Sequence, residues 1–110
     1  ITLLPDASIT AAHDNPHFAL AFARIENHYF VHRGFFDEGQ LLRDAPRLAA
    51  IPGVIVQGRY DACTPVKTAW DLHRAWPQAE FHLVPDAGHA FKEPGILDRL
   101  IRATDRFAST

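Results

Sequence analysis

A chain of 110 residues has room for one modest hydrophobic core, so we expect a single domain or part of one. Its 47% hydrophobic and 22% charged residues and its formal net charge of −2 are typical of a globular protein, and they argue against disorder, a membrane span and nucleic-acid binding. The single cysteine, Cys63, excludes an internal disulfide and a thiolate metal cluster, and we expect a cytoplasmic protein. Because the chain starts at Ile1 and contains no methionine, we also expect it to be a piece of a longer protein.

The predicted elements alternate between helix and strand. The stretch Asp14-Asn15-Pro16 offers a cap and a first-turn proline for an aromatic-rich helix, and Thr64 and Pro65 offer the same for a later one. A run rich in valine and isoleucine predicts a strand that is buried on both faces. In chain order, the pattern predicts a helix over 15–32, a short helix or irregular segment interrupted by Pro46 over 41–49, a strand over 53–57, a helix from 65 to 76, a strand over 81–84 and a helix over 95–108. This order is typical of part of an open α/β sheet.

Two residues with catalytic potential follow the two predicted strands. Asp61 comes just past the first strand, and His89 comes just past the second. Chemistry in open α/β sheets collects at the carboxyl ends of the strands, and neighbouring parallel strands end at the same edge. We therefore expect the carboxylate to accept a hydrogen bond from the imidazole. The order of acid and then histidine matches the last two members of the α/β-hydrolase triad, whose nucleophile comes earlier in the chain.

Each of these residues also has an ordinary structural explanation. An aspartate after a strand commonly forms a turn or caps a helix, and a histidine after Ala-Gly is often only a loop residue. Their joint position, with a helix between the two strands, strengthens the catalytic interpretation and leaves the structural one open.

Two stretches of sequence resemble a known peptidase family. They are ARIENHYFVHRGFF at 23–36 and GRYDACTPVKTAWDLHRAWPQAEFHLVPDAGHAFKEPGI at 58–96. From about residue 14 to the end, the chain resembles the carboxyl-terminal third of bacterial proline iminopeptidases, which belong to the α/β-hydrolase superfamily. The resemblance implies the last two parallel strands of that fold with their flanking helices, with residues 1–40 as the end of a helical cap and residues 41–110 as the carboxyl-terminal part of the core.

The resemblance also implies an activity and the residues that perform it. By this resemblance, the family removes an amino-terminal proline from peptides with serine, aspartate and histidine, and with no cofactor. Asp61 would be the triad acid and His89 the triad base, while Glu26 would hold the free amino group of the substrate. Two positions depart from the family pattern, because Ala90 replaces a frequent serine and His32 replaces an asparagine.

A carboxylate at position 26 has a physical rationale of its own. An aminopeptidase must distinguish a free α-ammonium from an amide, and a desolvated carboxylate does so because an amide would leave the acid unpaired. From the pattern alone, a solvated glutamate paired with Arg24 or Arg33 is the alternative.

Cys63 and a histidine pair are weaker candidates. Cys63 lies two residues past Asp61, and we expect it near the substrate pocket rather than as the nucleophile, since it lacks the strand-to-helix elbow that presents one. His28 and His32 have the i, i+4 spacing of zinc ligands, but the pattern fixes no third ligand, so we expect no metal site.

The nucleophile is missing from the sequence. There is no Gly-x-Ser-x-Gly motif, and the only serines are Ser8 and Ser109. We therefore expect the 110 residues alone to be inactive and, with strand edges unpaired, prone to associate. A different α/β-hydrolase, such as an esterase, would share Asp61 and His89 without needing Glu26. A non-catalytic binding module would need none of the three.

Overall fold

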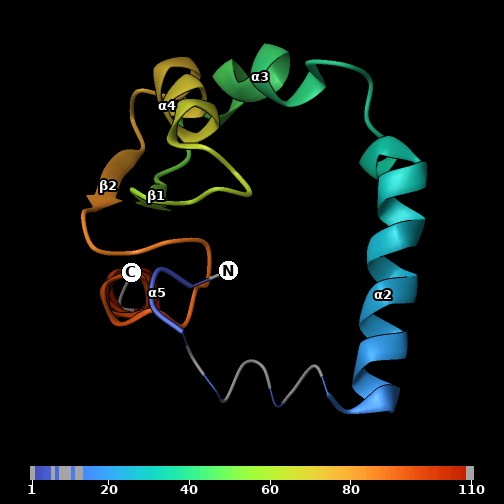
Figure 1. The fold of residues 1–110 in the computed structure, drawn as a ribbon. Helices are drawn as coiled ribbons and strands as arrows, with labels where there is room; N and C mark the ends of the chain where they lie inside the picture. The colour runs from blue at the N-terminus through green and yellow to red at the C-terminus, as the bar shows by residue number, and fades with distance from the viewer. Residues whose placement is uncertain (1, 6, 8–10, 12–13, 109–110) are drawn as a thin grey trace. The chain divides into compact units, whose positions relative to one another are not determined.

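The structure, a computed structural model, describes residues 2–5, 7, 11 and 14–108 (Figure 1). Ser8 and Ser109 lie outside these residues. The chain forms two compact units, one made of residues 4–41 and the other of residues 42–110 together with 1–3. The assignment of residues 1–40 to a helical cap stays a prediction.

The first unit contains one long helix, α2 (Pro16–Val31), followed by a short 3₁₀-helix, η1 (Arg33–Phe35). Pro16 occupies the first turn of α2, as predicted, and the cap within the predicted stretch is Asn15, whose side chain accepts hydrogen bonds from the backbone N–H groups of His17 and Phe18. After α2, Gly34 takes a left-handed conformation with φ of 62°, which glycine adopts without steric cost. The predicted helix over 15–32 is therefore confirmed within one residue at each end.

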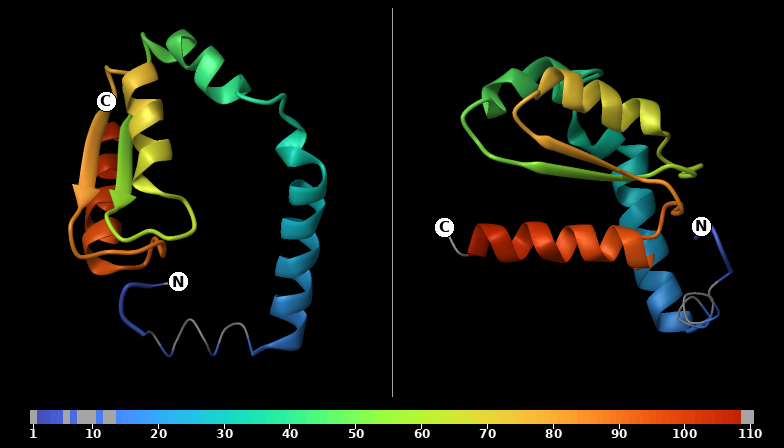
Figure 2. Two further views of the ribbon diagram at one scale, coloured as in Figure 1. Left: turned by 45° about the horizontal axis from the view of Figure 1, so that its top comes forward. Right: turned by 90° about the vertical axis from the view of Figure 1, so that its left-hand side faces the viewer.

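The second unit is built on two parallel strands. Strands β1 (Val54–Gly58) and β2 (Glu80–Val84) pair in register from Val54 with Glu80 to Gly58 with Val84. The connection between them contains α4 (Val66–Ala75), and α5 (Pro94–Ala108) follows β2. Figure 2 shows both strands pointing the same way, with α4 and α5 on opposite faces of the sheet. The predicted α/β class and the predicted parallel pairing are confirmed.

Short helical segments lead into β1. Helix α3 (Gln40–Asp44) is followed directly by a 3₁₀-helix, η2 (Ala45–Leu48), which has Pro46 in its first turn. The change of helix type fits the predicted interruption at this proline, because proline removes a backbone donor from the α-helical ladder.

The sequence prediction of a Thr64 cap is wrong. Pro65 is the N-cap residue of α4, and no side chain makes a capping hydrogen bond there. The Thr64 hydroxyl donates to Asp61 instead, at 2.7 Å.

The core of this unit is thin. Its buried cluster consists of Val84, Ala87 and Ile96, with Val56 and Leu100 partly buried against it. Strand β1 was predicted to be buried on both faces. In the structure only Gln57 and Gly58 are buried, and the other residues of β1 are partly exposed. The described sheet has two strands, so apolar side chains such as Trp70 and Leu83 keep 48% and 40% of their surface exposed.

None of the helices in the described part of the chain has the length and apolar composition that a membrane span requires.

Candidate active site

The site lies where the carboxyl ends of β1 and β2 approach each other. A Cβ atom added to Gly58 would lie 1.9 Å from the carbonyl oxygen of Gly88, so the two backbones approach this closely only because residue 58 is glycine. Beyond Gly58, the N–H of Arg59 donates to the carbonyl of Val84, and the N–H of Tyr60 donates to that of Ala87, each at 2.9 Å. These backbone bonds join the two loops that carry Asp61 and His89.

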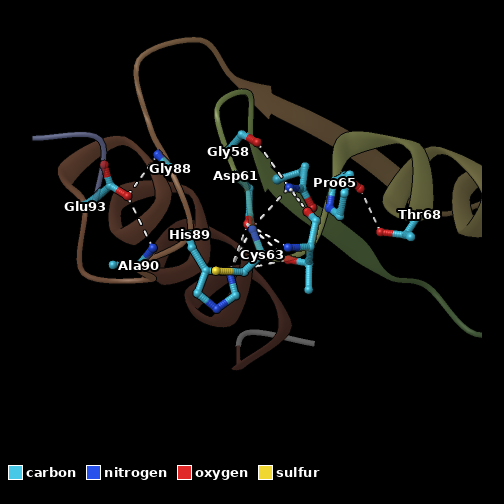
Figure 3. Close-up of polar contacts among 11 residues, drawn as sticks. Gly58, Asp61, Cys63, Pro65, Thr68, Gly88, His89, Ala90 and Glu93 are labelled. Atoms are coloured by element: carbon cyan, nitrogen blue, oxygen red, sulfur yellow. Dashed lines mark hydrogen bonds and ion pairs between the residues drawn. The ribbon is translucent and has the colours of Figure 1, made fainter. Parts of the chain in front are cut away.

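Asp61 and His89 are in hydrogen-bonding contact, as predicted. Nδ1 of His89 lies 2.9 Å from Oδ2 and 3.1 Å from Oδ1 of Asp61 (Figure 3). The Asp61 side chain is only 6% exposed, whereas that of His89 is 39% exposed. The arrangement therefore combines a buried acid with an imidazole that remains accessible from outside.

The Asp61 carboxylate is held by a ring of donors. Its Oδ1 atom accepts hydrogen bonds from the backbone N–H groups of Cys63 and Thr64, at 2.9 and 2.8 Å. Its Oδ2 atom accepts the Thr64 hydroxyl at 2.7 Å and, more weakly, the Gln57 amide at 3.4 Å. These bonds fix the carboxylate plane, and with it the direction from which the imidazole is held.

The donors also control the charge of this acid. Burial raises the pKa of Asp61, but the hydrogen bonds from the Thr64 backbone, His89, the Thr64 hydroxyl and the Cys63 backbone together lower it from 3.8 to about 2. At neutral pH the group is an ionised carboxylate, which can only accept hydrogen bonds. His89 must then donate from Nδ1, so the neutral imidazole has its free lone pair on Nε2, the arrangement that a general base requires.

Gln57 is a buried polar residue whose role was not predicted. Its amide nitrogen donates to the carbonyls of Gly58 and Thr64, at 3.1 and 3.0 Å, and so joins the end of β1 to the turn that carries Asp61. The sequence did carry a signal, because an amide within a buried apolar strand needs a polar partner.

Cys63 lies beside the acid and histidine, and it is exposed. Its sulfur and the ligand-type atoms of Asp61 and His89 all lie within 4.8 Å of one another, the one such group of three among the described residues. Both Asp61 oxygens already accept several hydrogen bonds, so a metal ion here would have to displace donors that hold the turn. The arrangement fits a hydrogen-bonded acid and base better than a metal centre.

His28 and His32 belong to a ring cluster. Both rings pack against Phe35, with centroid distances of 5.5 and 5.0 Å. In the described part of the chain, no third residue joins this pair to make a metal-ligand group.

Glu26 lies on α2, in the unit formed by residues 4–41, and its side chain is exposed. Within the described residues it makes no ion pair with Arg24 or Arg33, the partners expected for a purely structural glutamate. Its proposed role in holding a substrate amino group stays a prediction.

Comparison with known proteins finds close relatives of this chain. No family model matches it. The proline iminopeptidase of Xylella fastidiosa is 61% identical over 106 residues, which cover 96% of this chain and 34% of that protein. The chain resembles proline iminopeptidases. Enzymes of that name from Xanthomonas citri and Arabidopsis thaliana are 60% and 49% identical, each over 94% of this chain and over 33% and 28% of their own lengths. The resemblance predicted from the sequence is confirmed, and the chain spans about a third of the length of these relatives, as a carboxyl-terminal third would.

Proposed function

We propose that these residues form part of a serine aminopeptidase that releases amino-terminal proline from peptides. The longer protein that would contain them is called the complete protein below. The observation that carries the proposal is the 2.9 Å contact between His89 Nδ1 and Asp61 Oδ2, in a chain that is 61% identical to a proline iminopeptidase over nearly its whole length.

The proposed mechanism divides the work between this chain and the rest of the complete protein. The ionised Asp61 holds His89 in the tautomer whose Nε2 accepts a proton. A serine outside these residues supplies the hydroxyl, which attacks the carbonyl of the amino-terminal proline as Nε2 takes its proton. His89 then returns the proton to the departing amine, and water releases the acyl group in a second, similar cycle. No step needs a cofactor or a metal ion.

Glu26 is proposed to bind the free amino group of the substrate. A carboxylate paired with the cationic amine of an amino-terminal proline would discriminate against blocked peptides, whose uncharged amide leaves the acid without a cationic partner. An esterase would use Asp61 and His89 without this requirement, so Glu26 separates the two candidate activities.

We also propose a cytoplasmic location. The single cysteine is free and exposed, which suits a reducing compartment.

The test compares three substrates on the complete protein: proline p-nitroanilide, its N-acetylated form and p-nitrophenyl acetate. We expect hydrolysis of the first and rejection of the second. Glu26→Gln should lower kcat/KM for proline p-nitroanilide by roughly 10- to 100-fold, the value of a lost charge-assisted hydrogen bond, and leave ester hydrolysis unchanged.

The matched control is Glu38→Gln, which alters another exposed glutamate of the same unit. Equal effects of Glu26→Gln on the amide and the ester would contradict the aminopeptidase assignment. Absence of proline release by the unsubstituted protein would contradict it outright.

A further inference from the structure

The loop between β2 and α5 carries His89, and its backbone must be fixed if the imidazole is to meet Asp61. Gly88 is buried, whereas His89 is exposed. Packing therefore restrains the residue before the histidine more than it restrains His89. Within the described residues, the polar side-chain contacts of His89 are with Asp61 and, at 3.4 Å, with the Thr64 hydroxyl. None of these contacts fixes the backbone of residue 89, which sets the direction in which the imidazole projects from the loop.

Glu93 makes hydrogen bonds that do determine this direction. Its Oε1 atom accepts from the backbone N–H of Gly88 at 2.9 Å and from that of Ala90 at 3.2 Å. These are the residues directly before and after His89. Figure 3 shows the Glu93 side chain directed at the backbone of Gly88 and Ala90, while the His89 ring extends away from it toward Asp61 and Cys63.

Glu93 is itself firmly anchored. It directly precedes α5, its carbonyl accepts the N–H of Leu97 at 2.9 Å, and its own N–H donates to the carbonyl of Ala90 at the same distance. The second carboxylate oxygen, Oε2, accepts the N–H of Leu3 at 3.0 Å. The side chain therefore connects the histidine loop to the start of a helix.

A carboxylate suits this task because one oxygen accepts two backbone donors in charge-assisted hydrogen bonds. Two donors that flank a single residue and converge on one atom restrict rotation of that residue's backbone. Without the acceptor, the two N–H groups would turn toward water or other partners, and the ring between them would lose its fixed direction.

We propose that Glu93 is a positioning residue that fixes His89 in the orientation at which Nδ1 meets Asp61. This role rests on the proposed function for its effect on turnover, but the geometric effect on the hydrogen bond between Asp61 and His89 is independent of the reaction. Glu93 does not contact the reacting atoms and acts only through the loop.

The test uses Glu93→Ala and Glu93→Gln in the complete protein. Glu93→Ala removes the acceptor, and we expect kcat for proline p-nitroanilide to fall about 100-fold, the cost of a misplaced catalytic group, with little change in KM. Glu93→Gln keeps one oxygen that can accept both N–H groups, while its NH₂ group would face the N–H of Leu3, so it should recover part of this loss. Asp98→Ala is the matched control, because it removes an exposed carboxylate of α5 that forms an ion pair with Arg102, and it should leave kcat unchanged.

A second measurement does not depend on turnover. The proton between His89 Nδ1 and Asp61 should give a far-downfield proton NMR signal in the unsubstituted protein and in Glu93→Gln, and this signal should be lost in Glu93→Ala. The proposal is overturned if Glu93→Ala keeps both the signal and its kcat, or if Glu93→Gln is as impaired as Glu93→Ala in both measurements. If the unsubstituted protein shows the signal but does not release proline, the proposed function fails while the NMR comparison still decides the role of Glu93.

Discussion

Replacing Asp61 by asparagine tests the link between the hydrogen-bond ring and catalysis. Asparagine has nearly the same shape, but one of its two terminal atoms is an NH₂ group, which is a donor. Oδ1 of Asp61 faces the backbone N–H groups of Cys63 and Thr64, so the asparagine oxygen should take this position. The NH₂ group then faces His89 Nδ1 and favours the tautomer whose proton is on Nε2. That tautomer cannot take a proton from a serine.

The substitution should have two effects, one on kcat and one on stability. An imidazole in the wrong tautomer should lower kcat by about 10³- to 10⁴-fold, as it does in serine proteases. The pKa of Asp61, lowered from 3.8 to about 2, corresponds to about 2 kcal/mol of folding free energy. Because the folded-state pKa lies below the unfolded one, this contribution is present above about pH 4 and is lost as the pH falls toward 2.

The assay combines kinetics with urea unfolding of the complete protein. Asp61→Asn should lose turnover of proline p-nitroanilide at every pH, be less stable at pH 7 by about 2 kcal/mol, and show a weaker decline in stability between pH 4 and pH 2 than the unsubstituted protein. Activity of the variant within about tenfold of the unsubstituted enzyme would refute the argument about the tautomer. An unchanged decline in stability with acid would refute the argument about the carboxylate.

Three further predictions concern the same site. Gly58→Ala should lower kcat by about 100-fold and should also lower the melting temperature. Its methyl group would collide with the Gly88 carbonyl and push the two loops apart. Kinetics near those of the unsubstituted enzyme would contradict this prediction. Thr64→Val should lower kcat by about tenfold, because it removes the hydroxyl that donates a hydrogen bond to Asp61. The control Thr68→Val removes a hydroxyl that donates to a backbone carbonyl, and it should leave kcat unchanged. Equal effects of the two substitutions would count against a specific role of the Thr64 hydroxyl. The isolated polypeptide of 110 residues should release no p-nitroaniline from proline p-nitroanilide, and it should elute as an associated species on size-exclusion chromatography. Turnover by the isolated polypeptide would mean that it contains a nucleophile of its own.

The strands, and through them the pairing of Asp61 with His89, could be predicted from the sequence. A run of branched apolar residues gives a local signal for β1, and a helical pattern between this run and a second, shorter apolar segment favours a right-handed parallel connection. Once two neighbouring strands are parallel, the residues just past their ends share one edge of the sheet. The order and spacing of the elements therefore predicted the contact on the condition that the two strands are parallel neighbours, which the structure confirms.

The supporting hydrogen bonds could not be predicted in the same way. Thr64 precedes a proline and a helix, which is the pattern of a cap, but its hydroxyl bonds to Asp61 because the turn brings the two within reach. Glu93 precedes Pro94 and looks like another helix-terminal acid, yet its side chain reaches back to the loop before it. Whether such a side chain bonds to its own helix terminus or to a residue in another part of a loop depends on the tertiary fold. The spacing of residues in the sequence does not determine which partner it takes.

The central claim is that Asp61 and His89 activate a serine that lies outside these 110 residues. The most direct measurement is labelling of the complete protein with a fluorophosphonate, followed by mass spectrometry of the labelled peptide, in the unsubstituted protein and in His89→Ala. We predict that one serine outside these residues is labelled, and that His89→Ala loses the label and proline release together. Labelling and proline release that continue at the original rate in His89→Ala would contradict the account.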